Sequence, residues 1–78
     1  MEANLQNVMR VLSDVNDEID FASEQNMVDD GLLDSFELIK MISALDEAFG
    51  IHIDAGAIEP ENFNSAQAIL DLVKALKS

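Results

Sequence analysis

The serine at position 35 is the strongest candidate for chemistry, because it follows Asp34 at the point where an amphipathic pattern begins. A serine nucleophile needs a general base and a group that orients that base. The 78 residues include no cysteine, tyrosine or tryptophan, and the one histidine is His52. A helix between Ser35 and His52 would separate them by roughly 20 Å, at about 1.5 Å per residue. We therefore expect no enzymatic activity and no catalytic residue; another protein would act on Ser35.

Clustered carboxylates raise a different chemistry, the binding of a metal ion. Asp14, Asn16, Asp17 and Asp20 are spaced like calcium ligands. An EF-hand loop that began at Asp14 would need a glycine at its sixth position and a glutamate at its twelfth, where this chain has isoleucine and glutamine. We therefore expect no dedicated metal site. One alternative stays open, which is weak binding of divalent cations by other acidic residues: Asp29, Asp30 and Asp34.

The net charge restricts the class of partner. Sixteen Asp or Glu residues stand against four Lys or Arg residues, which gives a net charge of −12. Nucleic acids and anionic membranes need a cationic protein surface, so we expect neither as a partner. Proteins with basic patches would be attracted, and their encounter would be fast and sensitive to salt. The alternative is that the charge only provides solubility.

We expect a single domain, residues 1–78, that lies in the cytoplasm and acts as a monomer. The absence of cysteine excludes disulfides and fits a reducing compartment. The first residues show no basic region followed by a long apolar run, so we expect neither a secretory signal nor insertion into a membrane. A chain of this length allows one domain.

Hydrophobic spacing predicts three long helices and one short helical turn. We expect helices over residues 3–19 and 35–49, a single turn over 60–62, and a last helix capped by Asn64. Gly50 suits the left-handed position that ends the second helix. The predicted fold class is all-α, a small four-helix bundle with three long helices and one short one.

Apolar residues outside and inside these helices define the expected core. In the connection over residues 20–34, Gly31 would supply a turn and five apolar residues would pin the loop: Phe21, Met27, Val28, Leu32 and Leu33. Phe63 would plug the core. The second helix would bury a stripe of five residues, with Ile39 on its flank: Leu38, Met41, Ile42, Leu45 and Phe49. The last helix would bury Ile69, Val73 and Leu76, with Ala66, Leu70 and Leu72 on the flanks.

The start of the second helix suits a covalently bound phosphate. Asp34 can cap the free backbone N–H groups, and Glu37 three residues later makes a variant of the capping box. Ser35 then occupies the first helical position, where N–H groups and the helix dipole favour negative charge. Asp30 and Asp34 oppose a phosphate electrostatically. Recognition by an enzyme with a basic surface would explain why acidic residues stand beside this site.

Phe36 marks the expected docking surface. At helical spacing Phe36, Lys40, Ser43 and Glu47 lie opposite the buried stripe, so we expect Phe36 to lie at the surface and not in the core. An apolar anchor with a polar rim is typical of a docking surface. The rim would also include Asp34, Glu37 and Asp46. The alternative is that Phe36 folds back over the loop.

These residues resemble the attachment motif of acyl and peptidyl carrier proteins. The segment 31–36, GLLDSF, is similar to their Asp-Ser-Leu pattern, with Phe36 in place of the usual leucine. Residues 44–49, ALDEAF, match the end of the family's second helix. Residues 60–65, PENFNS, match the segment that leads into the family's last helix. Lys40 stands at a position commonly acidic in fatty-acid carriers. The motif LLDSF is similar to that of D-alanyl carriers and of stand-alone carriers for amino-acid-activating enzymes.

The resemblance implies that the cofactor 4′-phosphopantetheine is attached covalently to Ser35, so that the chain is a phosphoprotein. Acyl or aminoacyl groups would ride as thioesters on this arm. The implied partners are a phosphopantetheinyl transferase, an acyl- or amino-acid-activating ligase, and downstream transferases or synthases of a biosynthetic pathway. A carrier-like interaction module that is never modified is the alternative.

Overall fold

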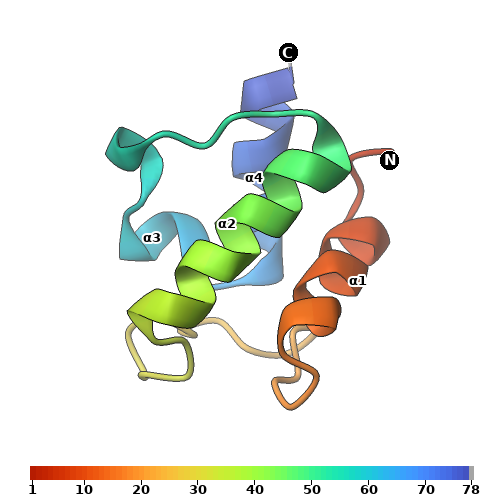
Figure 1. The fold of residues 1–78 in the computed structure, drawn as a ribbon. Helices are drawn as coiled ribbons and strands as arrows, with labels where there is room; N and C mark the ends of the chain where they lie inside the picture. The colour runs from red at the N-terminus through yellow and green to blue at the C-terminus, as the bar shows by residue number, and fades with distance from the viewer. Residues whose placement is uncertain (78) are drawn as a thin grey trace.

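The computed structural model describes residues 1–77, and position 78 of the predicted domain lies outside this range. The elements in chain order are α1 (Leu5–Val15), α2 (Ser35–Phe49), the 3-10 turn η1 (Ala55–Ala57), α3 (Pro60–Phe63) and α4 (Ala66–Lys77). The predicted all-α fold with three long helices and one short one is confirmed (Figure 1). Among the described residues, no helix has both the length and the apolar character needed to cross a membrane.

The helices pack around one core. The helix α1 packs against α2 and α4, and α3 packs against α4 (Figure 1). The connection from α1 to α2 runs along the end of the molecule that is opposite both termini (Figure 1). Phe63, predicted to plug the core, is fully buried. The other large side chains with almost no exposed surface are Val8, Leu12, Met27, Met41, Leu45, Ile69 and Val73.

Local side chains set the bounds of α1. Asn4 is the cap, and its Oδ1 accepts a hydrogen bond from the Asn7 N–H at 2.8 Å. The helix ends at Val15, four residues earlier than predicted. The cause is Asn16, which is extended and whose Oδ1 accepts from the Glu18 N–H, a local bond that competes with the helix. Ile19 still packs against the core from outside the helix.

Both ends of α2 agree with the prediction. Asp34 Oδ1 accepts from the Glu37 N–H at 2.8 Å. Gly50 is left-handed at φ 65°, and the Ile51 N–H donates to the Asp46 carbonyl, which is the 6→1 bond of a Schellman end. Lys77 Nζ donates to the Phe49 carbonyl at 3.0 Å and so satisfies a further orphan group of this helix end.

The predicted cap of the last helix is wrong. Ser65, not Asn64, caps α4, because Ser65 Oγ accepts from the Ala68 N–H at 3.1 Å. Asn64 is helical in conformation and belongs to the end of α3, whereas a capping residue is extended. The Asn64 side chain faces the connection between α1 and α2 instead.

Replacement of Ser65 by alanine tests the cap. We expect Ser65→Ala to lower the free energy of unfolding by about 1 kcal/mol, because the first turn of α4 loses the acceptor for one N–H. Urea unfolding followed by circular dichroism measures the change. Ser13→Ala, an exposed serine inside α1, is the control and should change stability by less than about 0.5 kcal/mol. Equal losses in both variants would contradict the assignment.

Three apolar residues are more exposed than predicted. Ile39 on α2 is 66% exposed, Leu32 in the connection is 40% exposed, and Leu76 near the end of α4 is 40% exposed. The pinning of the connection is otherwise confirmed: Phe21, Met27 and Leu33 are buried, Val28 is half-buried, and Gly31 is left-handed at φ 75°.

Candidate functional site

Ser35 lies exposed at the first position of α2. Its hydroxyl makes no hydrogen bond to any group among the described residues. The preceding residue, Asp34, is also exposed, but its Oδ1 is held by the Glu37 N–H. The serine oxygen is therefore open to an outside reactant, and no side chain within residues 1–77 accepts a hydrogen bond from it.

The backbone at this point suits a phosphate on Ser35. In the first turn, the Glu37 N–H is taken by the Asp34 side chain and the Leu38 N–H by the Asp34 carbonyl. The N–H groups of Ser35 and Phe36 have no such partner within residues 1–77. Free N–H groups at a helix start favour an anion. The donor set therefore fits a phosphodiester on the serine oxygen.

Phe36 projects into solvent next to the serine. Its side chain is 61% exposed, and this exposure favours the docking surface over the alternative in which it folds back over the loop. Lys40, one turn later, places Nζ 4.5 Å from the centroid of the Phe36 ring. This is cation–π distance, and it covers part of the ring with a positive charge.

Ile39 is a surface residue that the sequence interpretation missed. It follows Phe36 by three residues, so the two side chains lie on neighbouring parts of one helical face. With 66% of its surface exposed, Ile39 is the most exposed large apolar residue among those described. The sequence did contain a signal for this exposure. The apolar residues of α2 spread around more of the helix than the stripe that faces the core, so some of them must remain exposed. We call Phe36 and Ile39 the apolar pair.

The polar residues predicted to surround the pair differ in how free they are. Ser43, Glu47 and Lys40 are exposed. Glu37 is half-buried, and its Oε2 accepts from Asn16 Nδ2 at 2.7 Å. Glu37 therefore joins the end of α1 to the start of α2, and a partner can read it only in part.

His52 lies beyond the other end of α2. It is exposed and follows Gly50 and Ile51, whereas Ser35 begins the same helix. With a rise of about 1.5 Å per residue, the 15-residue helix α2 holds the two residues roughly 20 Å apart. The structure thus does not bring the one imidazole to the serine.

Two of the four residues with calcium-like spacing, Asn16 and Asp20, make local hydrogen bonds, and Asp14 lies within α1. Asp20 accepts from the Ala22 N–H through Oδ1 and from the Ser23 hydroxyl through Oδ2. Asn16 bonds Glu18 and Glu37. Over residues 1–77 there is no group of three or more His, Cys, Asp or Glu residues arranged to hold a metal ion.

Glu59 and Glu61 form an acidic pair at the start of α3, outside the Ser35 surface. A hydrogen bond with the Glu61 side chain, and then the negative charge of Glu61, raise the pKa of Glu59. The folded state therefore keeps this proton to a higher pH than the unfolded state. The stability that the shared proton contributes is lost as pH rises through the raised pKa of Glu59.

Neutralising Glu61 tests the pair. We expect Glu61→Gln to lower the pKa of Glu59 toward the ordinary glutamate range, because the negative charge of Glu61 is removed and the new amide can donate a hydrogen bond to the ionised Glu59 carboxylate. Carbon-13 NMR titration of the Glu59 carboxyl measures it. Glu47→Gln on α2 is the control and should leave that pKa unchanged. A raised Glu59 pKa that persists in Glu61→Gln would contradict the pairing.

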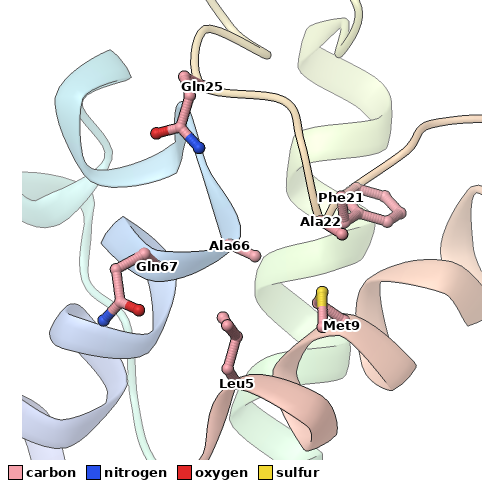
Figure 2. A pocket seen from close by; sticks show the side chains of 7 residues that line it. All are labelled: Leu5, Met9, Phe21, Ala22, Gln25, Ala66 and Gln67. Atoms are coloured by element: carbon pink, nitrogen blue, oxygen red, sulfur yellow. The ribbon is translucent and has the colours of Figure 1, made fainter.

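A shallow pocket of about 260 Å³ lies at another part of the surface (Figure 2). It is enclosed by the start of α1, the connection to α2 and the start of α4. Its lining carries no formal charge and no nucleophile, and it shares no residue with the Ser35 surface. The lining residues are Leu5, Met9, Phe21, Ala22, Gln25, Ala66 and Gln67.

The comparisons assign no family. No model of a known protein family matches the chain, and no curated protein matches it. The functional interpretation therefore rests on the residues around Ser35 and on the sequence pattern.

Proposed function

We propose that this protein is a carrier that holds acyl or aminoacyl groups as thioesters on a 4′-phosphopantetheine arm attached to Ser35. The observation that supports the proposal most is the state of the serine: it is exposed, free of hydrogen-bond partners among the described residues, and placed at the first position of α2. The resemblance of residues 31–36 to a carrier motif adds the chemical identity of the arm.

In the loading step, the Ser35 oxygen acts as the nucleophile. A phosphopantetheinyl transferase binds coenzyme A as the donor. The serine oxygen forms a bond to the phosphorus next to pantetheine, the bridging P–O bond of the pyrophosphate breaks, and adenosine bisphosphate leaves with the electron pair. The serine proton passes to a base of the transferase, because His52 lies at the far end of α2.

The arm supplies the thiol on which cargo is held, since the chain has no cysteine. The protein itself positions the acyl group that the arm carries. A tethered acyl group reaches an active site without a separate encounter once the carrier has docked. Within the proposal the protein works in the cytoplasm, and an activating ligase and downstream transferases or synthases load and unload it.

The docking surface is the exposed face of α2 beside Ser35. The apolar pair supplies the anchor, and Lys40, Ser43 and Glu47 supply a polar rim, with Asp34 at the helix start. A basic surface on the partner fits the net charge of −12.

Loading by a broad-specificity phosphopantetheinyl transferase tests the proposal. Intact-mass spectrometry of the co-expressed protein should show the addition of one arm, and peptide mapping should place it within residues 31–36. A transferase that modifies a known carrier in parallel, but leaves this protein at its unmodified mass, would contradict the proposal.

An unmodified interaction module is the second candidate. The observation that favours it is the exposure of the apolar pair, which could bind a partner without any arm. It predicts partner binding that survives replacement of Ser35, together with an unchanged mass after exposure to the transferase.

A further inference from the structure

Asn64 bonds the connection between α1 and α2 with every polar group that its side chain has. Its Oδ1 accepts from the Val28 N–H at 3.0 Å and from the Asp29 N–H at 3.1 Å. Its Nδ2 donates to Asp29 Oδ2 at 3.0 Å. The Asn64 carbonyl also accepts from the Met27 N–H at 2.9 Å. Three consecutive residues of the connection are therefore tied to one residue at the end of α3.

The segment that Asn64 holds is itself a closed turn. The Met27 carbonyl accepts from the N–H groups of Leu32 and Leu33, at 2.9 and 3.3 Å. The Gly31 N–H donates to the Val28 carbonyl at 3.1 Å. Met27 is fully buried and Leu33 nearly so. The turn over residues 27–33 is thus closed by its own hydrogen bonds and anchored in the core at both ends.

This unit leads directly into the site. Leu33 is followed by Asp34, the cap of α2, and then by Ser35. If the bonds from Asn64 were lost, the turn would keep its internal bonds but lose its side-chain attachment to the α3–α4 junction. The cap at Asp34, one residue after the turn, would then be held less firmly.

We propose that Asn64 is a positioning residue for Ser35. It fixes the turn over residues 27–33, and through this turn it holds the start of α2 in the position from which Ser35 is presented. Its effect on arm attachment rests on the proposed function, whereas its effect on the order of the turn and of the helix start does not.

Amide hydrogen exchange of Asn64→Ala tests the structural half. We expect exchange at Val28 and Asp29 to become about fivefold faster or more, the factor that one lost hydrogen bond gives. Exchange at Glu37, whose N–H is bonded to the Asp34 cap, should become about twofold faster or more. The Gly50 amide at the other end of α2 is the internal reference and should change least.

The matched control is Asn62→Ala. Asn62 is also an asparagine of the α3 region, but its Nδ2 donates to the Ala57 carbonyl, away from the connection. It should leave exchange at Val28, Asp29 and Glu37 within about twofold of the parent protein. Unchanged exchange at Val28 and Asp29 in Asn64→Ala, or faster exchange there with no change at Glu37, overturns the proposal.

Transferase kinetics test the functional half. In Asn64→Ala a smaller fraction of the carrier molecules would have the ordered start of α2 that the transferase binds. The KM for this variant should therefore rise several-fold, while kcat stays within about twofold. Asn62→Ala should keep the KM of the parent protein. Equal KM values for the two variants overturn the positioning role. A parent protein that is never loaded contradicts the proposed function alone, and the exchange data then decide the role of Asn64.

A double variant distinguishes the specific bonds from general damage. Asn64→Asp combined with Asp29→Asn keeps the acceptor oxygen for both N–H groups, reverses the bond between the two side chains, and leaves the net charge unchanged. We expect exchange and KM to return to within about twofold of the parent values. Failure of this double variant, with Asn64→Ala also impaired, assigns the effect to lost packing and overturns the proposal.

Discussion

Ser35→Ala is expected to abolish attachment of the phosphopantetheine arm, with no residual mass increase after complete reaction of the parent protein. The reason is chemical, because the variant lacks the only oxygen at the first position of α2 that can form the phosphodiester. Ser35 is exposed and makes no hydrogen bond among the described residues, so the fold should be retained. Intact-mass spectrometry and the melting temperature, measured on the same sample, separate the two effects.

Ser43→Ala is the matched control for that experiment. Ser43 is an exposed serine of the same helix, two turns further on. The variant should accept the arm completely, although its rate of loading can fall if Ser43 contacts the transferase. Arm attachment that persisted in Ser35→Ala would show that the site is misassigned, and complete loss in Ser43→Ala would show that docking rather than the nucleophile had been disrupted.

The largest loss of stability is expected for Phe63→Ala. Phe63 ends α3, which packs against α4, and its side chain is fully buried in the core. Truncation of a buried phenylalanine typically costs about 3–5 kcal/mol, from lost burial and from the cavity that remains. Single domains have only about 5–15 kcal/mol of stability, and short ones lie at the low end. We expect the variant to be largely unfolded at 37 °C, as measured by urea unfolding and circular dichroism.

Phe36→Ala makes the same chemical change at the surface. Because the Phe36 ring is 61% exposed, we expect its loss to change stability by less than about 1 kcal/mol. The same variant should weaken loading by the transferase if the ring is a docking anchor. A comparable loss of stability in the two variants would contradict the assignment of Phe63 to the core and Phe36 to the surface.

The features that could be predicted from the sequence depend on nearby residues. The cap at Asp34 and the left-handed end at Gly50 follow from residues within one helical turn. The exposure of Ile39 could not be predicted, because it depends on which elements cover that side of α2. The cap at Ser65 was missed for a related reason. Asn64 had the better capping pattern, but its side chain bonds Val28, 36 residues away, and this partner is visible only in three dimensions.

In the site, too, features set by nearby residues could be predicted, and features set by distant residues could not. Exposure of Phe36 follows from helical spacing, and the structure agrees with it. Ser35 lies on the side of the buried stripe by spacing, and it is exposed at the first position of the helix. The bond between Glu37 and Asn16, 21 residues apart, joins two helices and has no local signal. The cation–π contact of Lys40 with Phe36 is local, yet its geometry depends on the side-chain rotamers.

Hydrogen bonds made by the acids of α2 restrict which positions are free to vary over evolution. Asp34 caps the helix, Glu37 holds Asn16, and Asp46 accepts from the Ile53 N–H at 3.0 Å. Selection on folding therefore acts on these acids whatever partner the protein has. The remaining exposed positions of the helix can change together with a partner at little cost to the fold, and lineage-specific recognition should be recorded there: Phe36, Ile39, Lys40, Ser43 and Glu47.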